Sequence, residues 1–242
     1  MYRTIIKPTL ILVTIAFIAS FALSHINRIT KGKIEERVRR SREQALLAVL
    51  PATLGYVITE KDKKVTVDGK DFFYTIAEKT EGDKKSRAYA FECEKSGYSG
   101  VIRSMAAVDE TMKLIGISVI QQSETPGLGA RAKEIATTDT FISHFFGSSK
   151  GKVAAGPVRS WFEEQFTGLD GSKQIGIMKK GEWRAENESL RKELMEKNSV
   201  SAITGATITT RAVIAGLENG IVQLRKVLEQ EKPAPAQEVK AK

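Results

Sequence analysis

The hydrophobic pattern begins with an uncharged apolar run from Pro8 to Ile26. The run covers about nineteen residues, close to the roughly 20 that an α-helix needs to cross a bilayer, and it predicts a transmembrane helix. A cleaved signal peptide is the alternative, because Ser20-Phe21-Ala22 loosely fits a small-x-small cleavage site. The apolar run continues past that site as far as Ile26, which favours a retained anchor.

A second helix is predicted from Ile34 to Leu50, with Pro51 as its stop. Its apolar stripe consists of Val38, Ala45, Leu46 and Val49. Two interpretations stay open for this helix. It forms either a solvated stalk or a segment that contacts lipid head groups.

Between residues 56 and 121 the pattern changes to short β-rich runs separated by turns. An Asp68-Gly69 turn joins Val65–Val67 to Phe72–Ala77. The later runs are Tyr89–Glu92, Val101–Val108 and Leu114–Ile120. Runs of this kind in close succession predict an antiparallel sheet.

Helical spacing returns in the second half of the chain. Phe141 and Phe145, followed by Gly147, predict a short helix, and Ala185–Lys197 predicts a polar one. A strand is expected between them at Ile175–Ile177. The last helix starts near Thr207, and its buried face is predicted to hold Val213, Leu217, Ile221, Leu224 and Leu228.

Together these elements predict an α+β protein: one N-terminal transmembrane helix, then an antiparallel-sheet domain with flanking helices. The expected boundaries are an anchor at 1–27, a basic juxtamembrane helix at 28–51, a folded domain at 52–230 and a disordered tail at 231–242. The tail is rich in Pro, Ala and charged residues and lacks core-forming side chains.

The net charge of +9 suggests nucleic-acid binding until its distribution is considered. Seven basic residues stand against two acidic ones between positions 28 and 42, and the remainder of the chain is mixed in sign. We therefore expect no nucleic-acid partner. With one cysteine, Cys93, and two histidines, no metal site is expected, and any redox carrier must be organic.

Membrane orientation is ambiguous from charge alone. The basic cluster after the apolar run would, by the positive-inside rule, hold the C-terminal side in the cytoplasm. Arg3 and Lys7 oppose that bias only weakly.

Four hydroxyls surround a glycine in Thr204-Gly205-Ala206-Thr207-Ile208-Thr209-Thr210, directly before the last helix. One interpretation is a helix N-cap. The other is a phosphate site, because free amide N–H groups and the helix dipole attract anions, and a threonine hydroxyl there is placed to become a phosphate ester.

Thr204-Gly205-Ala206-Thr207 resembles the flavinylation motif of the FMN-binding domain family. This domain occurs in the G subunit of the Rnf electron transport complex and in the C subunit of the sodium-translocating NADH:quinone reductase. Two further segments, Gly97–Ile102 and Glu124–Gly129, resemble family segments in the same order. The chain length and the Tyr98-Ser99 segment favour the Rnf protein, with the quinone-reductase protein as the near alternative.

The resemblance implies an FMN bound covalently through a phosphoester to Thr207. The other expected cofactor-binding residues are Thr204, Gly205, Ala206, Thr209, Thr210, Glu124, Thr125, Pro126, Gly127, Leu128 and Gly129. Pro126-Gly127 is also a type II turn signal, so a purely connecting loop is the alternative. No protein residue is expected to act as a catalytic acid, base or nucleophile, because the flavin would supply the redox chemistry.

The resemblance further implies an electron-carrying component of a ferredoxin:NAD complex in the inner membrane, with its flavin domain on the periplasmic side. Its expected partners are other membrane subunits, membrane lipid and, during maturation, a flavin transferase. The family often has an acidic residue where this chain has Ser201. A flavin redox sensor and a non-flavin scaffold are the rival functions.

Three further residue groups allow smaller predictions. Trp161, Phe162 and Phe166 form either an aromatic wall beside the flavin or part of the core. Cys93 is expected to be an inert small hydrophobe. Arg211 either screens the phosphate or is solvated.

Overall fold

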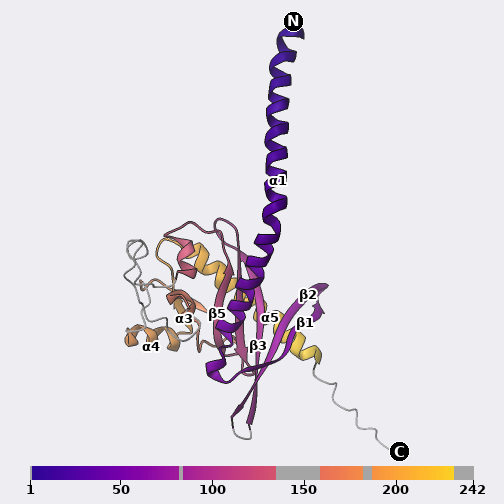
Figure 1. Cartoon of the computed structure of the whole chain (residues 1–242). Coiled ribbons are helices and arrows are strands. Elements are labelled where there is room, and N and C mark those ends of the chain that lie inside the picture. Colours follow the sequence, from indigo (N-terminus) through magenta and orange to yellow (C-terminus); the bar gives the residue numbers. More distant parts are fainter. Residues whose placement is uncertain (1, 82–83, 135–158, 182–186, 232–242) are drawn as a thin grey trace, which may run out of the picture. The chain divides into compact units, whose positions relative to one another are not determined.

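The computed structural model describes residues 2–81, 84–134, 159–181 and 187–231 (Figure 1). The chain divides into two compact units, Met1–Ser41 and Arg42–Lys242. The predicted helix around Phe141 and Phe145 lies outside the described residues, as does the predicted tail from residue 232 onward.

The first unit consists of helix α1, Tyr2–Val49, whose last two turns belong to the second unit. The predicted anchor and the predicted juxtamembrane helix are therefore one continuous helix. Ion pairs one turn apart, Lys31 with Glu35 and Arg40 with Glu36, support the polar stretch. Within the described residues, this is the one helix long and apolar enough to cross a membrane, and its most apolar window has a mean hydropathy of 2.1.

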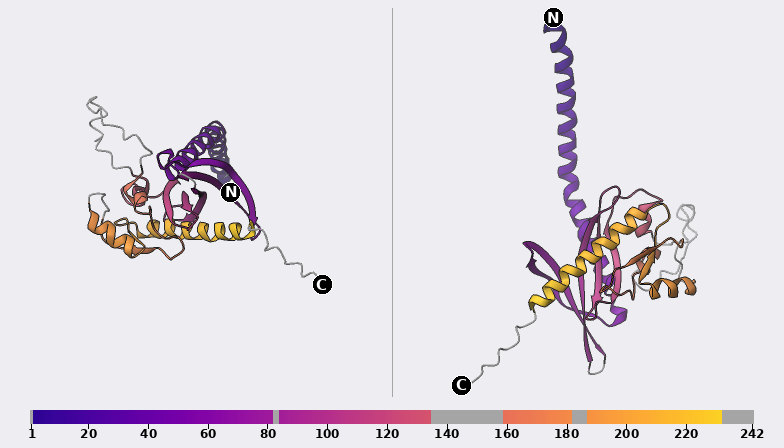
Figure 2. Two further views of the ribbon diagram at one scale, coloured as in Figure 1. Left: turned by 90° about the horizontal axis from the view of Figure 1, so that it is seen from below. Right: turned by 180° about the vertical axis from the view of Figure 1, so that it is seen from behind.

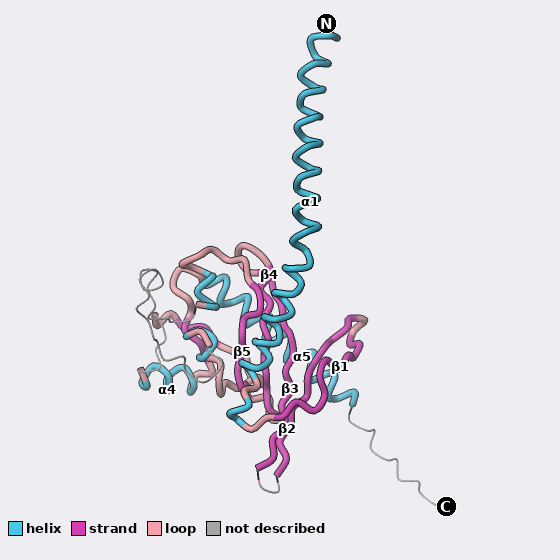
Figure 3. The backbone as a smooth tube through the Cα atoms, viewed as in Figure 1, coloured by secondary structure: helices cyan, strands magenta, loops and turns pink. Residues whose placement is uncertain are grey.

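The second unit is built on a five-stranded antiparallel sheet in the order β1-β2-β3-β4-β5 (Figure 3). The strands are β1 Val57–Val67, β2 Lys70–Glu81, β3 Lys84–Ser96, β4 Val101–Asp109 and β5 Leu114–Gln121. The predicted fold class is confirmed. β1 begins eight residues before the predicted run because it is an edge strand whose charged stretch Glu60–Lys64 hides the alternation.

Helix α5, Thr207–Glu231, crosses one face of the sheet (Figure 2). Its apolar positions share a core with Phe91 and Cys93 of β3 and Ile102 of β4. Of the predicted buried face, Val213, Leu217, Ile221 and Leu224 are buried and Leu228 is partly buried. Burial raises the pKa of the Cys93 thiol to about 12, which agrees with an inert side chain.

The other face of the sheet is covered by the end of α1. Ala45, Leu46, Val49 and Leu50 pack on a surface made largely of alanine, from Ala77, Ala88, Ala90 and Ala107. Small side chains of the sheet thus meet the larger side chains of the helix end. Neither a solvated stalk nor a lipid-contacting segment describes Ala45, Leu46, Val49 and Leu50, because they are part of the domain core.

Short elements complete the second unit. They are η1 Ala52–Leu54, η2 Gly129–Lys133, α3 Trp161–Glu164, β6 Gly176–Met178, α4 Glu188–Glu196 and β7 Ser199–Ser201. β6, close to the predicted strand, pairs in parallel with β7, a strand that was not predicted. Phe162 and Phe166 are fully buried in the main core, so their interpretation as an aromatic wall beside a cofactor is wrong.

Arg159 fastens the end of α1 to the rest of the domain. Its Nε donates to the Ala48 carbonyl at 3.0 Å, and its Nη1 donates to the Ile115 carbonyl at 3.3 Å and to Thr167 Oγ1 at 3.0 Å. The Arg159 guanidinium thus donates to a carbonyl at the helix end that has no intrahelical donor. The same group joins the end of α1 to β5 and to the segment after α3.

Replacing Arg159 with methionine should lower the free energy of unfolding by about 2 kcal/mol, since several hydrogen bonds to a charged group are lost. Urea denaturation of the full chain in detergent measures this. Arg211→Met is the matched control, because Arg211 is exposed, and should stay within about 0.5 kcal/mol of the parent. Equal stability of the two variants would show that Arg159 does not hold α1 to the domain.

Candidate functional site

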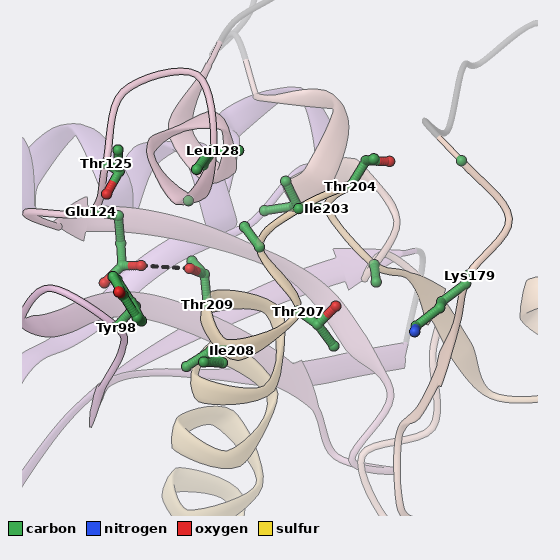
Figure 4. A pocket seen from close by; sticks show the side chains of 15 residues that line it. Tyr98, Glu124, Thr125, Leu128, Lys179, Ile203, Thr204, Thr207, Ile208 and Thr209 are labelled. Carbon is green, nitrogen blue, oxygen red and sulfur yellow. Dashed lines mark hydrogen bonds between the residues drawn. The ribbon is translucent and has the colours of Figure 1, made fainter.

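A cavity of about 870 Å³ lies at the start of α5 (Figure 4). Three segments that are distant in the sequence form its wall: the 97–100 turn, the 124–129 loop and the 202–209 stretch. Lys179 and Gly181, which follow β6, complete the wall. The full lining is Tyr98, Glu124, Thr125, Leu128, Gly129, Lys179, Gly181, Ala202, Ile203, Thr204, Gly205, Ala206, Thr207, Ile208 and Thr209.

The segment before α5 is a tight turn that points the helix start into the cavity. The Ala206 amide donates to the Ile203 carbonyl at 2.9 Å. Thr210 ties this turn to the helix, because its hydroxyl accepts from the Ile203 amide at 3.1 Å and donates to the Ala206 carbonyl at 3.2 Å. Thr207 is the first helical residue, so the amides of Thr207, Ile208 and Thr209 have no intrahelical acceptor.

The 124–129 loop contains the turn that the sequence predicts. The Leu128 amide donates to the Thr125 carbonyl at 3.1 Å, and Gly127 has a φ of 74°, as a type II turn requires. Thr125 and Leu128 line the cavity while Pro126 and Gly127 do not. The loop is thus both a connecting turn and part of the cavity wall.

Glu124 joins the three segments. Its side chain is 6% exposed. Oε1 accepts from the Ser99 amide at 2.9 Å, and Oε2 accepts from the Thr209 hydroxyl at 2.5 Å (Figure 4). A Cβ at Gly97 or at Gly129 would lie within 2.6 Å of a Glu124 carboxylate oxygen, so glycine at both positions makes room for the carboxylate.

The rest of the wall is amphipathic. Tyr98, Leu128 and Ile208 line the cavity yet are 72%, 44% and 54% exposed. Lys179, directed toward Thr207 in Figure 4, is the one cationic side chain among the described lining residues. Apolar side chains at one part and a cation with a helix N-terminus at another suit a flat apolar ring that carries an anionic group.

Most of the predicted site residues meet at this cavity. Those that line it are Thr204, Gly205, Ala206, Thr207, Thr209, Glu124, Thr125, Leu128 and Gly129. Pro126, Gly127 and Thr210 do not, and Thr210 has the structural role described above. Arg211 is exposed and outside the lining, so the solvated interpretation describes it.

Six lining residues were not predicted from the sequence. They are Tyr98, Lys179, Gly181, Ala202, Ile203 and Ile208. Tyr98 and Ile208 lie within Gly97–Ile102 and Thr204–Thr210, the segments that carry the family resemblance, and could have been found there. Nothing in the local sequence distinguishes Lys179 from other surface lysines.

Ser201 is fully buried, and its hydroxyl donates to the Gly181 carbonyl at 2.5 Å. An acidic side chain has no proton to donate when ionised. In this chain the position therefore supports the cavity wall beside Gly181.

Comparison with known protein families agrees with a nucleotide site of this kind. The model of the FMN-binding domain family matches residues 97–222, just over half of the chain, and the chain belongs to this family. The matched range includes all of the residues that line the cavity.

The chain is similar to the G subunits of several ion-translocating complexes. It is 25% identical to the G subunit of the Na(+)-translocating ferredoxin:NAD(+) oxidoreductase complex of Acetobacterium woodii, over 91% of each chain. It is 26% identical to the G subunit of the ion-translocating oxidoreductase complex of Pasteurella multocida, over 92% of this chain and 94% of that one.

Among solved structures, the chain is similar to the C subunit of the Na(+)-translocating NADH-quinone reductase from Parabacteroides distasonis. The identity is 18%, the TM-score is 0.48, and the match covers 81% of this chain and 95% of that one.

Replacing Thr209 with valine keeps the shape of the side chain but leaves the buried Glu124 carboxylate without one of its two donors. We expect the free energy of unfolding to fall by about 1–3 kcal/mol. Thr209→Ser, which keeps the hydroxyl, should recover most of this loss. Thr204→Val is the control at an exposed position of the same cavity and should change stability by less than about 0.5 kcal/mol. If Thr209→Val and Thr204→Val are equally stable, the hydrogen bond to Glu124 does not hold the three segments together.

Proposed function

We propose that this chain is an electron-carrying component of a membrane complex that couples electron flow between ferredoxin and NAD to ion transport, with FMN esterified to Thr207. The observation that carries the proposal is the cavity itself. In a member of the FMN-binding domain family, it combines a threonine at a helix start with apolar walls and a cation. The kind of complex is inferred from the names of the relatives.

The residues present fit such a group. Thr207 is half-buried at the cavity wall, so its hydroxyl is within reach of a bound nucleotide. The amides of the first turn of α5 would stabilise a phosphoryl anion. Tyr98, Leu128 and Ile208 offer apolar surface to a flavin ring, which would supply one-electron and two-electron chemistry when bound.

Ester formation needs an activated flavin nucleotide, whose phosphoryl group carries a leaving group, and a flavin transferase. The Thr207 hydroxyl oxygen forms the new bond to phosphorus, and the bond to the leaving group breaks with its electron pair. The hydroxyl proton passes to a base of the transferase. Covalent attachment suits a domain outside the cytoplasm, where a dissociated cofactor could not be recovered.

The proposal places α1 in the inner membrane and the domain that begins at Arg42 on the periplasmic side. The basic residues between 28 and 42 would lie at the lipid head groups. Their charge disfavours this orientation by the positive-inside rule. Contacts of α1 with other membrane subunits would then have to offset the unfavourable charge.

Thr207→Ala should abolish covalent flavin in protein coexpressed with a flavin transferase, because the acceptor hydroxyl is gone. A denaturing gel viewed under ultraviolet light measures this. Thr207→Ser keeps a hydroxyl and should keep its fluorescence. If the Thr207→Ala band is fluorescent, the ester is on another hydroxyl. If the band of the unsubstituted chain is dark, the non-flavin scaffold is favoured.

A reporter that is active only in the periplasm, fused after Gln230, should be active. Gln230 lies in the last turn of α5 and is exposed, so the fusion keeps the buried face of α5 and removes the contacts of Glu231 with Tyr74 and Lys63. The same fusion with a reporter that is active only in the cytoplasm is the control. Activity of the cytoplasmic reporter alone would refute the proposed orientation.

Thr207→Ala should also separate assembly from electron transfer. Loss of one threonine near a helix start costs about 1 kcal/mol, against typical domain stabilities of about 5–15 kcal/mol. The variant should therefore copurify with its partner subunits while the complex loses electron transfer from ferredoxin to NAD. An assembled, flavin-free complex with a normal rate would contradict the relay and favour a sensor or a scaffold.

A further inference from the structure

We propose that Lys179 is the counter-ion of the flavin's phosphoryl group and that it makes the cavity select FMN over riboflavin. The inference rests on the proposed function of the cavity as an FMN site. Lys179 is thus a specificity-determining residue that lies more than twenty positions before the threonine-rich segment.

The backbone on both sides of Lys179 is fixed to the strand that leads into α5. The Ala202 amide donates to the Met178 carbonyl at 2.8 Å, which extends the pairing of β6 with β7. On the other side, the Ser201 hydroxyl donates to the Gly181 carbonyl at 2.5 Å. These bonds anchor the backbone around Lys179, which lines the same cavity as Thr204 and Thr207 and has an exposed side chain.

The charges of the cavity leave Lys179 available for a ligand. Glu124 is the one acidic side chain among the described lining residues, and both of its oxygens already accept hydrogen bonds from Ser99 and Thr209. The neighbouring Lys180 differs, because its ammonium pairs with Glu193 at 3.1 Å. In the described part of the chain, Lys179 has no such ion pair.

Two positive features therefore face the same end of the cavity. The N-terminus of α5 carries a partial positive charge, and Figure 4 shows the Lys179 side chain directed toward Thr207 at that terminus. An anion between them would stabilise both. A phosphoryl group joined to Thr207 would have this position, whereas riboflavin has no charged group to offer.

The test uses the full chain in detergent with Thr207→Ala as the parent, so that no ester can form. FMN and riboflavin are each titrated at low salt and followed by flavin fluorescence. Adding Lys179→Gln should reduce the preference for FMN over riboflavin about fivefold, as expected for an exposed ion pair. Riboflavin affinity should stay constant.

Lys179→Arg should keep the preference for FMN, and so should Lys180→Gln, the matched control. Raising the salt should weaken FMN binding in the parent more than in Lys179→Gln.

An unchanged preference in Lys179→Gln would overturn the inference, as would a parent that binds FMN no better than riboflavin or does not bind it. These outcomes differ from failure of the proposed function, which the ultraviolet gel of the Thr207 chain reports independently. A fluorescent gel with an unchanged preference refutes only the role of Lys179. A dark gel with a preference that depends on Lys179 refutes only the ester.

Discussion

The buried carboxylate of Glu124 is the constraint on which the site depends. Removing a carboxylate from water is costly unless hydrogen bonds replace the lost hydration. Here the replacements come from Ser99, 25 residues earlier, and from Thr209, 85 residues later. Satisfying one charge therefore requires the 97–100 turn, the 124–129 loop and the start of α5 to meet at one place, and the cavity is the space that they enclose.

The remainder of the domain keeps that meeting point rigid. α5 is packed along the sheet by a continuous apolar face, so its first turn cannot shift without disturbing the core. The opposite face of the sheet is covered by the last two turns of α1, which Arg159 holds through the Ala48 carbonyl. The sheet is thus packed on both faces, by α5 on one and by the end of α1 on the other.

Much of this architecture could be predicted from periodicity. The spacing of Val213, Leu217, Ile221 and Leu224 predicted the buried face of α5, and the β-rich runs predicted an antiparallel sheet. The local sequence pattern did not predict the packing partners of a side chain where these depend on tertiary contacts. Residues 45–50 have the same apolar spacing whether they face lipid or alanines of a sheet, and Phe162 and Phe166 could pack equally well on a ring or in a core.

The candidate site shows the same division. The residues of the 124–129 loop and of the threonine-rich segment were predicted because both segments resemble motifs of the FMN-binding domain family. Turn chemistry and hydroxyl content alone left a connecting loop and a helix N-cap as alternatives. Lys179 was not, since its place in the cavity depends on the parallel pairing of β6 with β7, which no short-range pattern reveals.

The central claim is that the three segments form one FMN site with Thr207 as its attachment point. Tandem mass spectrometry of the peptide that spans the start of α5, from protein matured with a flavin transferase, tests it most directly. The account predicts an added FMN phosphoryl ester on Thr207 alone. The ester on Thr204, Thr209 or Thr210, or an unmodified peptide, would contradict it.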